Sequence, residues 1–185
     1  MTDLDSLLDE ATPAFEDVRI CLDGARRAEW NALTEQAMQR DDAEGADGRM
    51  AAPSKSALAR KQLDALADEL RERLLTIRIY AVPGTKWAAL KGKHRPRKDN
   101  AQDASQGYNI EAVAREALVE SGKRVNGDKV EDISAGQWGK LLDKVGGGDF
   151  QTLVYATIGV NQLIGQQFVG ALVKGSPATS NSAGK

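Results

Sequence analysis

The first half of the chain switches between two hydrophobic periods. Apolar residues lie two apart, as in half-buried strands, over residues 15–22 and 76–83. They lie three or four apart, as in amphipathic helices, over residues 25–42 and 53–74. A short break containing glycine separates the two helical stretches. The pattern therefore predicts a helical hairpin between two short antiparallel strands that pair with one another.

The second half of the chain carries several helix-start signals. Asn109 and Asp149 suit N-cap positions, and Ser134 with Gln137 matches a capping box. The polar stretches 99–106 and 122–132 are expected to be a loop and a connection. The fold class is thus α+β and mainly α, with a C-terminal group of helices. Four segments are expected: a mobile acidic lead (1–14), a strand–helical hairpin–strand–helix core (15–122), a C-terminal helical lobe (123–173) and a disordered tail (174–185).

Composition excludes several classes of function. The 185 residues have a net charge of −2, so the whole molecule is not an electrostatic nucleic-acid binder. Cys21 and His94 are the only residues of their types, which excludes an internal disulfide and a cysteine-based zinc site. The acidic start has no signal-peptide pattern, and glutamines interrupt the apolar stretch 150–173. We therefore expect a soluble cytoplasmic protein without a cofactor.

A run of cations, here called the basic segment, is the most unusual feature of the chain. It comprises six residues with no acid among them: Lys86, Lys91, Lys93, Arg95, Arg97 and Lys98. Such a run is typical of contact with phosphates or an acidic protein surface, or of a solvated loop balanced by the acidic lead. The aromatic residues that would stack on single-stranded nucleic acid are missing from it. We interpret His94, which lies within the run, as a loop histidine.

No catalytic arrangement stands out. Residues 146–148 are glycines before a helix, but the Lys-Ser/Thr of a phosphate-binding loop does not follow. No pair of carboxylates is marked by its spacing, and Cys21 is more typical of a small packed residue than of a nucleophile. The final helix is apolar on more than one side, so either the rest of the chain or another chain must cover it. A non-enzymatic binding protein is the expected class.

The order of certain residues resembles a known family. The chain has a strand ending in Val18–Gly24, a charged hairpin, a second strand and then a series of short motifs: Trp87-x-x-Leu90, His94-Arg95-Pro96, Tyr108-Asn109, Trp138-x-x-Leu141, Phe150-x-x-Leu153 and Asn161. Over roughly residues 15–165 this resembles the tail assembly chaperones of long-tailed bacteriophages, particularly those of actinobacterial hosts. That family often has His-Pro-Pro where this chain has His94-Arg95-Pro96.

The resemblance implies a non-enzymatic assembly factor in the host cell cytoplasm that is absent from the mature virion. It implies binding to the tape measure protein, and a role with tail tube subunits as they polymerise around that protein. It also implies a longer form made by programmed frameshifting, for which the final Gly184-Lys185 suits a slippery codon pair. Self-association remains open. The alternatives are a small nucleic-acid-binding protein that uses the segment 86–98, or a virion head–tail structural subunit.

We predict a partner-binding surface on the last helix, steered toward acidic stretches of the partner by the basic segment. Burial of apolar surface supplies the affinity, and docking of a helix into a groove is the natural mode. The predicted contact residues are Phe150, Val154, Ile158, Phe168 and Leu172, with Lys91, Lys93, Arg95, Arg97 and Lys98.

Overall fold

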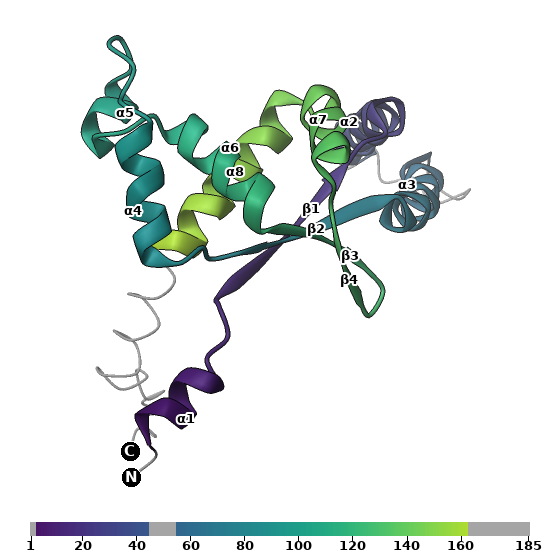
Figure 1. Ribbon diagram of the computed structural model, residues 1–185. Helices are drawn as coiled ribbons and strands as arrows, with labels where there is room; N and C mark the ends of the chain where they lie inside the picture. The colour runs from purple at the N-terminus through teal and green to yellow at the C-terminus, as the bar shows by residue number, and fades with distance from the viewer. Residues whose placement is uncertain (1–2, 45–54, 163–185) are drawn as a thin grey trace, which may run out of the picture. The chain divides into compact units, whose positions relative to one another are not determined.

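The computed structural model describes residues 3–44 and 55–162. In chain order these residues form α1 (Leu4–Asp9), β1 (Phe15–Cys21), α2 (Gly24–Glu44), α3 (Lys55–Glu72), β2 (Leu74–Tyr80), α4 (Gly84–Lys93), α5 (Ala101–Gln106), α6 (Ile110–Ser121), β3 (Gly122–Asn126), β4 (Lys129–Asp132), α7 (Ala135–Lys144) and α8 (Gly147–Gln162) (Figure 1). The fold is α+β and mostly helical, as predicted, with both predicted strands and the hairpin present.

The chain divides into two compact parts. Among the described residues, those from 19 to 75 form one, here called the hairpin unit, and the others form the second, here called the sheet unit. The division predicted from the sequence, a core over residues 15–122 and a helical lobe over 123–173, stays a prediction. The predicted tail, 174–185, lies outside the described residues.

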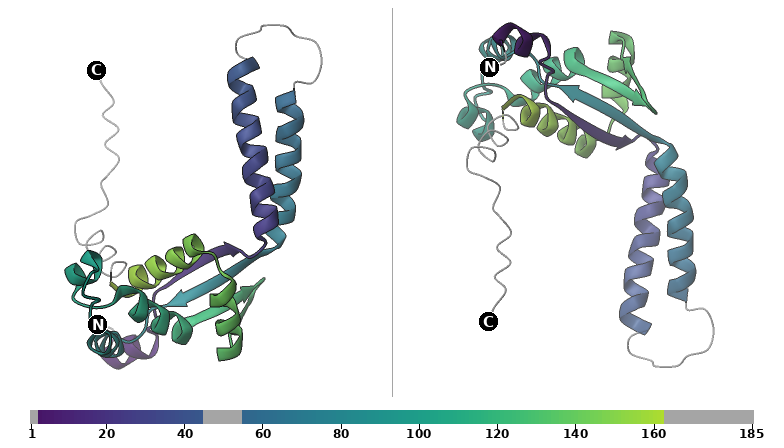
Figure 2. Two further views of the ribbon diagram at one scale, coloured as in Figure 1. Left: turned by 90° about the horizontal axis from the view of Figure 1, so that it is seen from above. Right: turned by 90° about the horizontal axis from the view of Figure 1, so that it is seen from below.

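The hairpin unit is built from α2 and α3, which lie antiparallel and side by side (Figure 2). Their buried residues include Ala37, Ala59 and Leu66. The two alanines have small side chains, which allow packed helices to approach closely. Arg26 pairs with Glu69 at 3.2 Å and thereby joins the two helices. A second ion pair, between Arg73 and Asp23 at 3.1 Å, lies near the strand ends of the hairpin.

The four strands form one antiparallel sheet in the order β1-β2-β3-β4. Thr76 lies opposite Val125, and Val125 opposite Val130, so each strand pairs with its neighbour in the chain. The prediction of a polar connection over residues 122–132 was wrong, because this stretch forms β3 and β4. Gly127 adopts a φ of 58° in the turn between them, a conformation that glycine tolerates best.

The sequence predicted the caps of α6 and α7 correctly, but Asp149 lies in the first turn of α8, which begins at Gly147, rather than at its N-cap. The side chain of Asn109 accepts a hydrogen bond from the backbone N–H of Ala112 at 3.1 Å, and Ser134 forms the expected capping box with Gln137. The loop expected over residues 99–106 is instead helix α5. Asn100 caps its start, and Gly107 ends it in the left-handed conformation with a φ of 78°.

The core of the sheet unit lies around α6. Its buried members come from α4, α6, α8 and the segments between them: Val82, Trp87, Leu90, Tyr108, Ile110, Val113, Ala114, Ala117 and Val154. The rings of Trp87 and Tyr108 meet edge to face with centroids 6.5 Å apart. Asn161 near the end of α8 accepts a hydrogen bond from the backbone N–H of Val82 at 2.9 Å. This bond ties α8 to the segment that follows β2.

Gly122, at the start of β3, is packed closely against Leu118 and Trp138. A Cβ atom at this position would lie 2.7 Å from the backbone oxygen of Leu118 and 2.7 Å from Cζ2 of Trp138. We expect Gly122→Ala to lower the free energy of unfolding by about 2 kcal/mol, because Trp138 is buried and the backbone cannot easily yield. Urea unfolding followed by tryptophan fluorescence measures this change.

Gly139→Ala in α7 is the matched control for that substitution. A Cβ atom at Gly139 meets nothing within 4 Å. Alanine favours the helix over glycine by about 1 kcal/mol, so this variant should be as stable as the native chain or slightly more so. Equal stabilities for the two alanine variants would show that Gly122 is not under steric constraint.

Candidate protein-binding surface

The described residues hold no obvious chemical centre. Among residues 3–44 and 55–162, no group of three or more histidines, cysteines and carboxylates could hold a metal ion. Within the same ranges, no helix is both long and apolar enough to span a membrane. The candidate sites among these residues are therefore surface features, of which the basic segment is the first.

Most cations of the basic segment contact other parts of the same chain. Lys86 pairs with Glu120, and Lys93 pairs with Glu116 at 2.7 Å, so α4 is joined to α6 at two levels. Nε2 of His94 lies 2.7 Å from the same Glu116 carboxylate. The hydrogen bond from Lys93, followed by that from His94, lowers the pKa of Glu116. These contacts add to the buried packing of Trp87 and Leu90, which holds α4 against α6.

Asp103 organises the loop that follows α4. Its side chain has no exposed surface, and its carboxylate accepts hydrogen bonds from Nε of Arg97 at 2.6 Å and Nη2 of Arg97 at 3.1 Å. It also accepts hydrogen bonds from the backbone N–H groups of Arg97 and Ile110. The side-chain hydrogen bond from Arg97 is the main cause that lowers the pKa of Asp103 to about 2. The first turn of α6 is thereby tied to residue 97.

The sequence had assigned five of these cations to a partner. Two of them, Lys93 and Arg97, have carboxylate partners within the chain, and Nζ of Lys91 lies 5.9 Å from the ring centre of Tyr108. Arg95 and Lys98 are exposed. Exposed ion pairs are weak, so these contacts do not prevent binding, but they leave less uncompensated charge for phosphates than the sequence suggested.

The three predicted apolar contact residues of the last helix that the structure describes all pack against the core. Val154 is fully buried in the core around α6, so its assignment to a partner surface was wrong. Phe150 and Ile158 are partly buried and pack against the same core. The physical reason is that the apolar face of α6 covers this side of α8. The other two predicted contacts, Phe168 and Leu172, lie outside the described residues.

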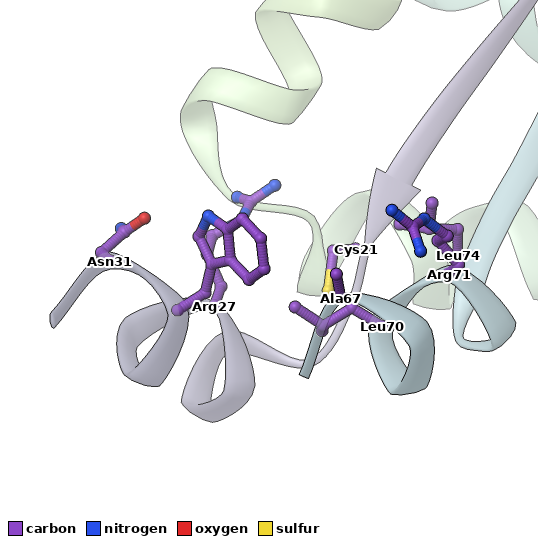
Figure 3. A pocket seen from close by; sticks show the side chains of 8 residues that line it. Cys21, Arg27, Asn31, Ala67, Leu70, Arg71 and Leu74 are labelled. Carbon is purple, nitrogen blue, oxygen red and sulfur yellow. The ribbon is translucent and has the colours of Figure 1, made fainter. Parts of the chain in front are cut away.

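An open apolar groove lies on the hairpin unit instead (Figure 3). Its volume is about 370 Å³, and it is lined by residues of α2 and α3 and of the strand ends that flank them: Cys21, Arg27, Trp30, Asn31, Ala67, Leu70, Arg71 and Leu74. We call this surface the hairpin groove. Trp30, Leu70 and Leu74 are only partly buried. The sequence pattern identified Trp30 and Leu70 as apolar helix positions but did not show that a groove opens beside them.

The hairpin groove suits an apolar segment of protein rather than a small polar substrate. Most of its lining is aliphatic, aromatic or sulfur-containing, and its two arginines are the only charged residues of that lining. Concave apolar surfaces of this kind bind the apolar face of an amphipathic helix. Comparison of the chain with protein family models, curated proteins and solved structures finds no match.

The buried carboxylate of Asp103 generates a test of the basic segment's structural role. Asp103→Asn should lower the free energy of unfolding by about 2 kcal/mol, less than for a fully buried pair because Arg97 is 41% exposed. Because the pKa of Asp103 is lowered in the folded protein, its stabilisation is present above its ordinary pKa of 3.8 and is lost as the pH falls toward about 2. The stability difference between native chain and variant should therefore shrink over that range, as measured by urea unfolding.

Asp99→Asn provides the control in the same loop. Its side chain is exposed, and the substitution should change the free energy of unfolding by no more than about 0.5 kcal/mol. A difference for Asp103→Asn that stayed constant as the pH fell to about 2 would contradict the assignment of the stabilisation to the Asp103 carboxylate.

Proposed function

We propose that this protein is a non-enzymatic tail assembly chaperone of a long-tailed bacteriophage, which binds the tape measure protein and promotes assembly of the tail tube. The order of motifs that resembles this family supports the proposal. In the structure, residues of these motifs have structural roles. Trp87, Leu90 and Tyr108 form part of one core, and Asn109 caps α6. The resemblance therefore lies in residues that determine architecture.

The observation that carries the proposal is the hairpin groove. It leaves Trp30, Leu70 and Leu74 partly uncovered at the surface of two packed helices. A tape measure protein is long and helical, so it offers many amphipathic helices whose apolar faces need cover before the tail tube forms. Each Å² of apolar surface that such a helix buries contributes about 25 cal/mol, less the ordering costs of association. The groove replaces the α8 surface as the proposed docking site.

In this mechanism the chaperone shields its client without a chemical step. The client helix would lie along α2 and α3 with its apolar side toward Trp30 and Leu70. Arg27 and Arg71 in the groove lining favour a client helix with acidic residues beside its apolar face. Release would follow when tail tube subunits compete for the same apolar surface of the client. Such a chaperone acts in the host cytoplasm and is absent from the finished particle.

Ala67→Glu tests the docking site. Ala67 lines the groove on α3, and glutamate keeps the helix propensity while placing a charge in the apolar contact. We expect this variant to weaken binding to the tape measure protein by about tenfold or more, equivalent to about 1.4 kcal/mol. Co-expression of the two proteins measures the effect as the soluble fraction of the tape measure protein, and isothermal titration of a soluble fragment measures the affinity.

Ala65→Glu is the matched control, because Ala65 is exposed on the same helix and is not part of the groove lining. It should support the client as well as the native chain does. Circular dichroism checks that both variants fold. Equal solubility of the tape measure protein with both folded variants would show that the groove is not the docking site. No increase in its solubility with the native chain would argue against the chaperone function itself.

A further inference from the structure

The short helix α1 exposes an apolar face. Leu4, Leu7 and Leu8 follow the spacing that places side chains on one side of a helix. Their exposed fractions are 66%, 52% and 62%, and no residue of α1 is buried. Three leucines exposed on one side of a short helix are costly to leave in water, so this face points to a partner that covers it.

Charge gives the second feature of α1. Asp5 and Asp9 lie within the helix, Asp3 precedes it and Glu10 follows it, and residues 3–10 include no basic residue. The partner of α1 should thus combine an apolar surface with cations at its edge.

The hairpin groove has both of these properties. Its lining includes Trp30, Leu70 and Leu74, and it includes Arg27 and Arg71 but no acidic residue. Arg71 also pairs with Asp68 on the exposed side of α3. A guanidinium has several N–H donors, so this pairing is compatible with a contact to a second carboxylate. An exposed pair between residues three apart contributes little stability and can rearrange easily.

We propose that α1 of one copy docks into the hairpin groove of a second copy. Leu4, Leu7 and Leu8 enter the groove, and the acidic residues of α1 face its arginines. The occupant is a second copy because β1 (Phe15–Cys21) separates α1 from the groove along the chain, and its seven extended residues span about 20 Å. Ala14 is also held beside β2 by a hydrogen bond from the backbone N–H of Ala81, so the few residues between α1 and Ala14 are too short to return α1 to Cys21. The contact is small, so the association is weak and reversible. Self-association through this site would cover the groove until a client helix with the same combination of apolar and acidic residues displaces α1.

The single cysteine of the chain allows a direct test. Cys21 lines the groove, so a cysteine on a docked α1 would come close enough for a disulfide, which requires the two Cα atoms to lie within about 7 Å. The native chain is mixed with a differently tagged chain that carries Leu7→Cys and Cys21→Ser. In a glutathione redox buffer we expect a disulfide-linked heterodimer on non-reducing gels. Each of these two chains has one cysteine, so this product can form only between copies.

The control chain carries Asp128→Cys and Cys21→Ser. Asp128 is exposed in the turn between β3 and β4, so it reports random collisions with Cys21. We expect at least about tenfold less heterodimer with this chain, as for a contact without specific affinity. Equal yields from both chains would overturn the proposal. A chain with Leu7→Cys and native Cys21 that closes an internal disulfide, and forms no dimer, would also overturn it, because α1 would then occupy the groove of its own chain.

Sedimentation equilibrium provides a second measurement that does not depend on cysteine chemistry. Replacing Leu4, Leu7 and Leu8 by serine should raise the dissociation constant of self-association by about tenfold or more, because the apolar contact is lost. The three leucines are exposed, so this variant should still fold. Met38→Ser with Leu58→Ser changes two exposed apolar residues outside the groove and should leave the constant unchanged.

A native chain that stays monomeric at every concentration would overturn the proposal. The inference shares the groove with the proposed chaperone function but not its client. Neither the disulfide test nor sedimentation equilibrium contains the tape measure protein. A negative result in them therefore does not change what the co-expression experiment says about the chaperone function. Conversely, self-association in the absence of any client effect would support this contact and count against the chaperone function.

Discussion

The sheet unit depends on the packing of neighbouring helices against the buried face of α6. Val113, Ala114 and Ala117 have no exposed surface, and α4 and α8 both pack against this helix. Alanine at two of these positions lets neighbouring helices approach more closely than larger side chains would allow. A larger residue at either alanine would force the surrounding helices apart. A smaller residue at Val113 would leave a cavity and remove contacts with its neighbours. Several of the short motifs along the chain supply neighbours of this helix or its cap.

The polar side of α6 explains the basic segment. Glu111, Glu116 and Glu120 lie on this helix, and each pairs with a cation from residues 86–97. The cations of α4 and its following loop thus pair with glutamates of α6, which lies one helix further along the chain. Viewed as sequence, the cations suggested a binding site for phosphate or for an acidic partner. In the folded chain, three of them help to hold α4 and its following loop on α6.

The elements that were predicted correctly from the sequence depend on local signals. The strands around the hairpin, the cap at Asn109 and the capping box at Ser134 depend on residues close together in the chain, and all were predicted correctly. The pairing of β3 with β4 was missed because charged residues obscure its alternation, although Gly127 in a two-residue turn was a usable signal. Helix α5 was missed because its six residues are mostly polar and small.

The candidate site was harder to predict, because it depends on which surfaces are covered. Val154 and Trp30 are both apolar residues at helical spacing, yet the first is fully buried and the second lines an open groove. Periodicity identifies an apolar face but not the element that packs on it. Only the folded chain shows that α6 covers the face of α8, while the flank of the hairpin that carries Trp30 stays accessible.

The junction between α6 and β3 has a further consequence. The helix ends at Ser121 and the strand begins at Gly122, with no linker between them. A shift of one residue in α6 turns its side chains by about 100°, and the same shift in β3 reverses which side of the sheet each side chain occupies. The positions of the residues in the helix and in the strand are therefore fixed relative to each other. An inserted or deleted residue at this boundary would misplace the apolar face of one element or the pairing of the other, with no slack between them to absorb the error.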